Sequence, residues 1–386
     1  MRITDIQTFL VDASAPSGWA TRNWLFVKVE TDAGIVGLGE ASGWPRVIQT
    51  AIADLTPILV GEDPRRIERL WQKMLLAMMG HGMTGIVGAG AMTGIEIALW
   101  DILGKSLGVP VCDLLGGRVR DRVRVYAHAS TVERAEELVG RGYTALKAGG
   151  LRHPVQTIRT LRQALGDAVD LCIDVHGPPW LSVPDAIRVG QELAEYDILF
   201  YEDPVPPENI DAIARVAAAI DVPLACGERS ATIYQFRELI ERDVADVIQP
   251  DMARAGGFSQ MKKIAGHAES HHIMVAPHDG SNGPIAEAAA LHLLAAIPNC
   301  LILEHLADDV PWRYEVTTNF EVVDSHITVP TAPGLGVTLN EAACAAHPGR
   351  GNVMNPAPET LDAMYVQSRP RRGRLWRIPD APAPGG

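Results

Sequence analysis

The chain has 386 residues, of which 47% are hydrophobic and 21% charged, the composition of an ordinary soluble globular protein long enough for about two domains. Its formal net charge of −13 disfavours nucleic acid or an anionic membrane as a partner, although a bound metal could still attract an anionic substrate. Five cysteines without C-x-x-C spacing indicate free thiols in a reducing compartment. Because the N-terminus lacks a long apolar stretch, we expect no signal peptide and a cytoplasmic location.

Residues 1–118 are predicted to form an N-terminal α+β domain. Alternating apolar positions predict three strands, at Arg2–Val11, Trp24–Glu30 and Val36–Glu40. Residues 45–108 have the pattern of helices, one of which is predicted to begin with Pro64 at its first position. A second helix is predicted from Thr84 to Leu107, ended by Gly108. The apolar window at 83–103 contains Glu96 and Asp101, so we interpret it as a buried helix and expect no membrane span.

Residues 119–325 alternate short apolar runs with amphipathic helical stretches. The eight runs are Val123–His128, Ala145–Lys147, Leu171–Asp174, Ile198–Glu202, Leu224–Glu228, Val244–Gln249, Ile273–His278 and Leu301–Glu304. Strands that alternate with helices predict a parallel sheet with right-handed crossovers. Eight such units favour a (β/α)8-type barrel, with a doubly wound open sheet as the alternative.

The C-terminal segment, 326–386, is predicted to run back to the first domain through short strands and the turn Pro333-Gly334-Leu335-Gly336. Its last part is rich in proline and arginine. We interpret that part as a solvated tail, with a subunit contact as the alternative.

Ionisable side chains stand at the ends of consecutive predicted strands. They are Lys147, Asp174, Glu202, Glu228, Asp251, His278 and Glu304. Each follows the previous one by about one strand–helix unit, so in a barrel they would form one ring at the end of the strands where barrel active sites lie. Burying so many charges in one ring is costly unless they bind something, and the ring is therefore a candidate active site.

The residue types in this ring suggest a metal site flanked by acid–base groups. Asp174, Glu202 and Glu228 offer only oxygen ligands, which suits Mg²⁺, with Mn²⁺ as a substitute. Asp251 and His278 would form a pair in which the carboxylate orients the imidazole. A substrate carboxylate bound to the cation would have an acidified α-proton for a base to remove.

The chain is similar to members of the enolase superfamily, in the mandelate-racemase-like subgroup. The resemblance covers residues 1 to about 345. It is carried by Glu96-Ile97-Ala98-Leu99-Trp100-Asp101, Asp174-Val175-His176, Tyr201-Glu202-Asp203-Pro204, Gly227-Glu228, Gln249-Pro250-Asp251 and Ala276-Pro277-His278. It implies a (β/α)7β modified TIM barrel with an α+β capping domain and one Mg²⁺ per subunit. Capping-domain loops around 19–24 and 80–85 would set specificity, with Trp19, Arg22 and His81 as candidate contacts.

One departure from the racemase pattern narrows the expected chemistry. Racemase-type members have Lys-x-Lys at the second barrel strand, whereas here Lys147 is followed by Ala148 and Gly149. His176, two residues after Asp174, is similar to its counterpart in acid-sugar dehydratases such as galactonate dehydratase. The resemblance therefore favours water loss from a sugar acid over racemisation, epimerisation or cycloisomerisation, and a non-catalytic binding protein is a remote alternative.

The roles implied are those of a proton-transferring hydro-lyase. His278, oriented by Asp251, would remove the α-proton, and His176 would protonate the departing 3-hydroxyl. Lys147 would hold the substrate carboxylate or act as an auxiliary base, and Glu304 would hydrogen-bond the enediolate. We expect a small carboxylate substrate and a homo-oligomer. The turn 280–284 is interpreted as a plain strand–helix turn, with an anion cradle as the alternative.

Overall fold

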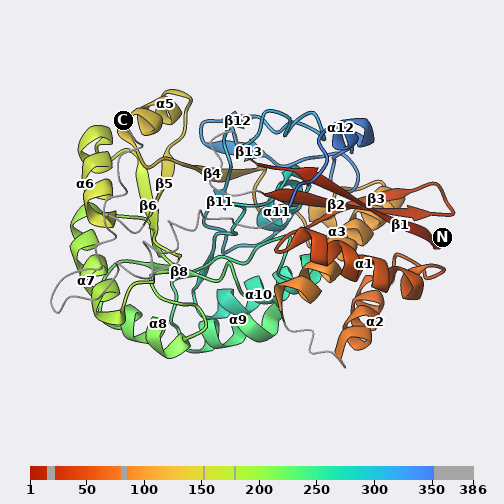
Figure 1. Cartoon of the computed structure of the whole chain (residues 1–386), viewed down its shortest axis with the longest axis horizontal. Helices are drawn as coiled ribbons and strands as arrows, with labels where there is room; N and C mark the ends of the chain where they lie inside the picture. The colour runs from red at the N-terminus through yellow and green to blue at the C-terminus, as the bar shows by residue number, and fades with distance from the viewer. Residues whose placement is uncertain (15–21, 80–84, 151–152, 178–179, 352–386) are drawn as a thin grey trace. The chain divides into compact units, whose positions relative to one another are not determined.

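The computed structural model describes residues 1–14, 22–79, 85–150, 153–177 and 180–351. These residues form two compact units (Figure 1). The first unit contains residues 1–125, 227–238 and 248–351, and the second contains 126–226 and 239–247, without the undescribed positions. Trp19, His81 and the arginine-rich tail lie outside the described residues. The domain bounds 1–118, 119–325 and 326–386 stay a prediction.

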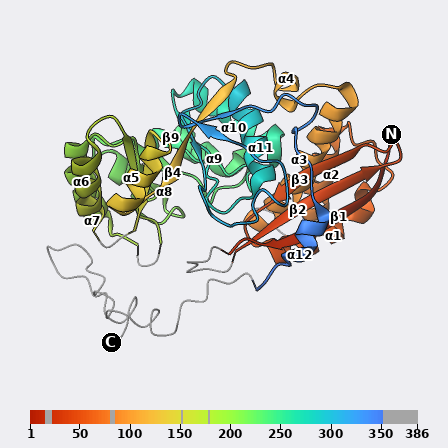
Figure 2. The same ribbon diagram turned by 90° about the horizontal axis from the view of Figure 1, so that it is seen from above.

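The first unit begins with an antiparallel sheet in the order β1-β2-β3. Its strands are β1 (Ile3–Asp12), β2 (Asn23–Thr31) and β3 (Val36–Ala41). Three helices lie alongside the sheet in Figure 2, namely α1 (Pro45–Leu59), α2 (Ile67–Met79) and α3 (Ile86–Leu107). Leu25, Val27 and Val29 of β2 pack with Ile95 and Leu99 of α3 in one apolar cluster. The three strands and the long helix predicted from the sequence are all present.

Two helix boundaries show what the local sequence controls. Gly108 adopts the left-handed conformation (φ 72°) directly after α3, so the predicted stop is confirmed. The predicted helix start at Pro64 is wrong, because α2 begins at Ile67. Asp63 instead accepts hydrogen bonds from the backbone N–H and the guanidinium of Arg65, which stabilises a turn before the helix.

Helix α3 is long and apolar enough to cross a membrane by length and composition alone, but 72% of its apolar window is buried inside the structure. It packs against β3, and backbone atoms of α3 approach so closely that a Cβ at Gly37 or Gly39 would meet Ala98 O or Gly94 O. We therefore interpret α3 as a core helix, as predicted from Glu96 and Asp101, which are both fully buried.

The rest of the described first unit contains short strands, short helices and two long helices. The elements are α4 (Val111–Leu114), α10 (Gly257–Ser270), β10 (Met274–Val275), α11 (Pro284–Ala296), β11 (Leu303–Glu304), β12 (Val322–Val323), β13 (His326–Thr328) and α12 (Glu341–Ala346). Two buried carboxylates hold the N-termini of the long helices. Glu96 accepts the backbone N–H groups of Phe258 and Ser259 in α10, and Glu40 accepts those of Gly283 and Ala286 at α11.

The second unit is a parallel sheet covered by helices. The strands β4 (Arg122–His128), β5 (Ala145–Gly149), β6 (Asp170–Asp174), β7 (Tyr201–Glu202) and β8 (Leu224–Cys226) pair in chain order. The helices are α5 (Val132–Gly140), α6 (Pro154–Leu165), α7 (Val183–Leu193) and α8 (Ile210–Ala217), and a 3₁₀ turn follows α7 at Ala194–Tyr196. Figure 1 shows α5 to α8 outside these strands. Strand β4 and two further elements, α9 (Thr232–Glu241) and β9 (Val247–Ile248), continue across the unit boundaries.

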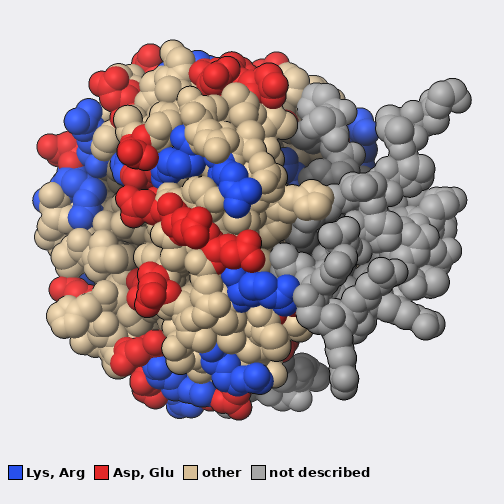
Figure 3. All heavy atoms as spheres, turned by 90° about the vertical axis from the view of Figure 1, so that its left-hand side faces the viewer, with Lys and Arg blue, Asp and Glu red and all other residues tan. Residues whose placement is uncertain are grey.

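The outer face of these helices carries both signs of charge. Figure 3 shows Lys and Arg side chains interspersed with Asp and Glu side chains over this face. Several are paired on the surface, such as Arg134 with Glu137 and Arg242 with Asp211. The excess of acidic residues therefore does not gather into one acidic patch on this face.

A strand occurs at each of the eight predicted positions, and the parallel pairing of β4 to β8 is confirmed. Several strands are shorter than predicted. The run Ile198–Glu202, for example, is hydrogen-bonded as a strand only at Tyr201–Glu202. A residue in an apolar run needs only to be buried, whereas a residue in a strand must also form backbone hydrogen bonds with a neighbouring strand. The apolar run is therefore longer than the strand.

Candidate active site

In the first unit, the predicted pair of Asp251 and His278 is brought together. Asp251 follows β9 and His278 follows β10, and Asp251 Oδ2 lies 2.7 Å from His278 Nδ1. Both residues are buried. Because a carboxylate on Nδ1 keeps the proton there, Nε2 is the nitrogen that is left to accept a proton.

The surroundings of His278 Nε2 are acidic. Glu228 Oε2 lies 3.3 Å away and Glu304 Oε2 lies 3.9 Å away. Burial opposes protonation of His278, but Glu228, Glu304 and the bond to Asp251 outweigh it and raise its pKa. The side chain of His278 is thus placed to take and hold a proton on the nitrogen that faces these carboxylates.

Glycine 280 leaves space beside this nitrogen. A Cβ at Gly280 would lie 3.0 Å from His278 Nε2 and 3.3 Å from Glu304 Oε1. The carbonyl of Gly280 accepts a hydrogen bond of 2.7 Å from the guanidinium of Arg22, at the edge of a predicted specificity loop. A small molecule could approach Nε2 where a side chain at 280 would otherwise intrude.

Arg254 supports the carboxylate of Asp251. Its Nε lies 3.2 Å from Asp251 Oδ2, and the guanidinium also contacts Ser42 and Ser281. Burial alone would raise the pKa of Asp251, yet Arg254, His278 and Asn282 together hold it below the usual range. Asp251 is therefore an anion under the imidazole of His278.

In the second unit, Asp174 and Glu202 stand side by side. They are paired residues on the neighbouring parallel strands β6 and β7, so their side chains leave the sheet on the same face. Lys147 from β5 reaches both, with Nζ 3.0 Å from Glu202 Oε2 and 3.9 Å from Asp174 Oδ2. The structure thus brings together three of the predicted site residues around a shared cluster of charges.

His176 is attached to this cluster by Asp174. Its Nδ1 lies 2.8 Å from both carboxylate oxygens of Asp174, and its backbone N–H donates to Oδ1. The side chain is 36% exposed, unlike that of Lys147, which is 3% exposed. An accessible imidazole held through Nδ1 presents Nε2 to solvent or to a ligand.

The donor set of the predicted metal ligands fits a hard cation. Asp174 and Glu202 supply carboxylate oxygens, and the ammonium group of Lys147 contacts both of these carboxylates. Glu228, the third predicted ligand, follows β8 by two residues and belongs to the other unit. In the described parts of the chain, no group of three or more His, Cys, Asp or Glu residues already has the arrangement of a metal site. The identity of the three ligands accordingly remains a proposal.

Some residues around the site were not singled out by sequence reasoning. Arg254 and Asn282 contact Asp251, yet they lie in turns whose residues have no periodic pattern.

The anion-cradle alternative at 280–284 is not supported, because Glu40 occupies the N-terminus of α11 through Gly283 and Ala286. Burial raises the pKa of Glu40 to about 7 despite these two N–H donors.

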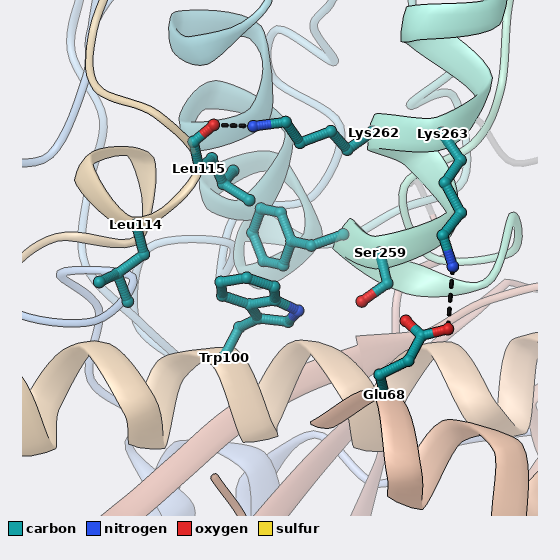
Figure 4. A pocket seen from close by; sticks show the side chains of 8 residues that line it. Glu68, Trp100, Leu114, Leu115, Ser259, Lys262 and Lys263 are labelled. Atoms are coloured by element: carbon teal, nitrogen blue, oxygen red, sulfur yellow. Dashed lines mark hydrogen bonds and ion pairs between the residues drawn. The ribbon is translucent and has the colours of Figure 1, made fainter. Parts of the chain in front are cut away.

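A pocket of about 270 Å³ lies elsewhere in the first unit (Figure 4). Trp100 and Phe258 are among the residues that line it. Lys263 pairs with Glu68 at its edge. Trp100 also donates its indole N–H to Glu96, the carboxylate that holds α10. The pocket shares none of the residues predicted for catalysis.

Two family models match the chain. The model described as "Enolase C-terminal domain-like" matches residues 130–343, and that of the "Mandelate racemase / muconate lactonizing enzyme, N-terminal domain" matches residues 13–116. The chain therefore belongs to the enolase superfamily, in the mandelate racemase and muconate lactonizing enzyme group. Its fold class is the (β/α)7β modified TIM barrel with an α+β capping domain, as predicted.

Named relatives include two sugar-acid dehydratases. A D-xylonate dehydratase of Haloferax volcanii is 36% identical over 386 aligned positions, with 91% of this chain and 90% of the relative covered. A D-galactonate dehydratase of Ralstonia nicotianae is 36% identical over 352 positions, with 83% of this chain and 89% of the relative covered.

Solved structures of similar chains have the same fold. A mandelate racemase/muconate lactonizing enzyme-like protein from Roseovarius sp. TM1035 has a TM-score of 0.84 at 34% identity, covering 92% of this chain and 97% of its own. The 3,6-anhydro-D-galactonate cycloisomerase of Zobellia galactanivorans has a TM-score of 0.83 at 31% identity, covering 90% of this chain and 99% of its own.

Proposed function

We propose that the protein is a Mg²⁺-dependent dehydratase of a sugar acid of the aldonate or aldarate class. It would remove the proton α to the carboxylate, eliminate the 3-hydroxyl and yield a 2-keto-3-deoxy acid. The observation that carries the proposal is the presence of two imidazoles that are each held through Nδ1 by a carboxylate, His278 by Asp251 and His176 by Asp174. The names of the D-xylonate and D-galactonate dehydratases support the same substrate class.

Asp174, Glu202 and Glu228 are the residues that would hold the cation. A divalent cation bound to them would make the proton α to a substrate carboxylate more acidic. Lys147 would hold the substrate carboxylate or act as an auxiliary base, since its ammonium group is buried beside Glu202 and Asp174. We propose one cation per subunit, with Mn²⁺ as a substitute.

Two proton transfers would complete the reaction. His278 Nε2 takes the α-proton while Asp251 stabilises the resulting imidazolium. Glu304 in its protonated form would donate a hydrogen bond to the enediolate. His176 Nε2 then protonates the departing 3-hydroxyl, and the enol product tautomerises to the keto acid.

The second candidate function is an epimerisation, racemisation or cycloisomerisation on the same scaffold. The similarity to a 3,6-anhydro-D-galactonate cycloisomerase favours keeping it. At Gly149, where racemase-type members carry their second lysine, a Cβ would have no heavy atom within 4 Å, so a side chain has room there. Glycine at that position supports dehydration, because the second base is missing although space is available.

A panel of sugar acids that includes D-xylonate and D-galactonate, incubated with Mg²⁺ and assayed with semicarbazide, tests the proposal. A keto acid is the expected product. A stereoisomer or lactone without keto acid would instead support the second candidate. If no acid turns over or loses an α-proton to D₂O, the remote alternative of a non-catalytic binding protein becomes the better interpretation.

Variants of the two histidines test their separate roles. We expect His278→Asn to lose both keto-acid formation and α-proton exchange in D₂O, each by roughly 10²- to 10⁴-fold. We expect His176→Asn to keep exchange but lose keto-acid formation. His272→Asn, which changes an exposed histidine, is the matched control. Full dehydration by His176→Asn would overturn its role as the acid.

We also propose that the protein acts in the cytoplasm as a homo-oligomer. The five cysteines have no C-x-x-C spacing, which suits a reducing compartment. Light scattering of the purified protein measures the oligomeric state, and a monomeric mass would contradict this part of the proposal.

A further inference from the structure

The carboxylate of Asp251 has a second buried side-chain partner besides His278. We propose that Asn282 is a positioning residue that fixes the orientation of this carboxylate and thereby aims Nε2 of His278. The inference rests on the proposed function, in which His278 is the base. It concerns a residue in the turn before α11 whose side-chain amide contacts Asp251.

The side chain of Asn282 is fully buried between two acids. Its Nδ2 donates to Asp251 Oδ1 at 2.9 Å and to Asp279 Oδ1 at 3.1 Å. Both amide hydrogens are therefore used. The reversed amide would place its oxygen against two carboxyl oxygens, so the chemistry of the neighbours determines which end of the amide faces them.

The hydrogen bonds divide the two oxygens of Asp251 between distinct tasks. Oδ1 accepts from Asn282 and from the backbone N–H of Ala253 at 2.8 Å. Oδ2 accepts from His278 and lies against Arg254. Donors on Oδ1 from two directions prevent the carboxylate from rotating, and this keeps Oδ2 in line with the imidazole N–H.

Asn282 is itself anchored on both sides. Its backbone N–H donates to Asp279 O at 3.1 Å, and its carbonyl accepts from the buried guanidinium of Arg313 at 3.3 Å. Asp279 in turn donates its backbone N–H to Glu304 Oε2 at 2.6 Å. The turn from His278 to Asn282 thus ties the imidazole, its carboxylate and Glu304 into one framework.

An amide suits this position better than an acid. Burial and the nearby Glu287 raise the pKa of Asp279, whereas Arg254 and His278 hold the pKa of Asp251 below its usual range. An aspartate at 282 would place a further carboxyl between them and remove both donated hydrogens. Shape alone would permit the exchange, so its effect reports on hydrogen bonding.

The test compares Asn282→Ala and Asn282→Asp with a matched control, Asn299→Ala. Asn299 is also buried, and its Nδ2 also donates two bonds of 3.0 Å, to the carbonyls of Ala265 and Ile273. Both alanine variants should lose thermal stability. With D-xylonate and D-galactonate as probes, only the Asn282 variants should lower kcat and α-proton exchange, by about 10- to 100-fold, with KM changed much less.

A second measurement needs no substrate. The low-field proton resonance of the imidazole N–H bound to Asp251 should shift or broaden in the Asn282 variants and stay unchanged in Asn299→Ala. If no acid of the sugar-acid panel turns over but this resonance responds in the Asn282 variants, the proposed function fails and the positioning role stands. Wild-type kcat together with an unchanged resonance in Asn282→Ala would overturn the inference. If Asn282→Ala does not fold, Asn282→Ser takes its place in the same measurements.

Discussion

The side chains at the strand ends owe their chemistry to their immediate partners. His278 and His176 are the same residue type, yet one is buried on an anionic Asp251 and the other is exposed on Asp174. Because His278 is buried, it would act as a base away from water. Because His176 is exposed, it can exchange protons with solvent or with a bound molecule. At the scale of single residues, the partner on Nδ1 and the access to Nε2 separate the two proposed roles.

A change at Asp174 tests the proposed cation site without any turnover. We expect Mg²⁺ and Mn²⁺ to raise the melting temperature of the wild-type protein, since a ligand that binds only the folded state stabilises it. Asp174→Asn removes one anionic oxygen donor and should weaken binding by tenfold or more. Calorimetric titration with each metal measures the affinity.

Asp167→Asn is the control for this experiment, because Asp167 is an exposed acid just before β6. It should bind both metals as the wild type does. Equal affinity in Asp174→Asn and the wild type would contradict the assignment of Asp174 as a ligand.

Among the elements, the helices α10 and α11 have their N-termini capped by carboxylates from distant parts of the chain. Their N-terminal N–H groups are satisfied by Glu96 from α3 and Glu40 from β3, residues far away in the sequence. The contact at α10 is so close that a Cβ at Gly257 would lie 2.0 Å from Glu96 Oε2, and Gly257 has a positive φ of 80°. These carboxylates hold the starts of the two helices, and the turn before α11 contains Asn282.

Removing one carboxylate should therefore destabilise the first unit. Glu96→Gln keeps the size of the side chain but places an N–H₂ group against N–H donors, and it should lower the free energy of unfolding by about 1–3 kcal/mol. Burial raises the pKa of Glu96 to about 7, so urea denaturation should be measured near pH 8, where the carboxylate is charged.

The matched control is Glu68→Gln, which removes a surface ion pair between α2 and Lys263 of the same helix α10. Exposed pairs of this kind contribute at most about 1 kcal/mol. If both variants lost the same stability, the carboxylate of Glu96 would have no special role at the start of α10.

For the molecule as a whole, the response to acid should depend partly on one buried histidine. His292 accepts the N–H of Cys112 on Nδ1 and lies 3.1 Å from Leu335 O through Nε2, which joins α4, α11 and the C-terminal segment. Burial lowers the pKa of His292 to about 4. The unfolded chain would bind a proton there at about pH 6.5, so the folded state must lose stability as the pH falls from 6.5 to 4.

Replacing this histidine should flatten that part of the curve. His292 accounts for up to roughly 3 kcal/mol of acid destabilisation, which His292→Gln should remove because glutamine cannot titrate. Chemical denaturation at a series of pH values measures the free energy of unfolding as a function of pH. His272→Gln, at an exposed site, should retain the wild-type slope, and a wild-type slope in His292→Gln would disprove the prediction.

The sequence predicted the order of elements well because their signals are local. The strands, the helices of the barrel repeat and the stop of α3 at Gly108 follow from periodicity and from a glycine that tolerates a positive φ. The predicted start of α2 at Pro64 was wrong because Asp63 accepts a hydrogen bond from Arg65, which stabilises a turn instead of the first helical turn. The Asp-Pro dipeptide by itself does not distinguish the two structures. Arg254 and Asn282 were not anticipated because a turn residue acquires its role from what lies opposite it.

By itself, the sequence determined the class of fold, the family and the kinds of side chain available at the strand ends, because these depend on spacing along the chain. The tertiary structure decided which nitrogen of His278 is committed to Asp251, which oxygens Asn282 holds, and how deeply each charge is buried. Protonation and orientation depend on contacts between residues distant in sequence and on removal from water, and neither is encoded in any single stretch.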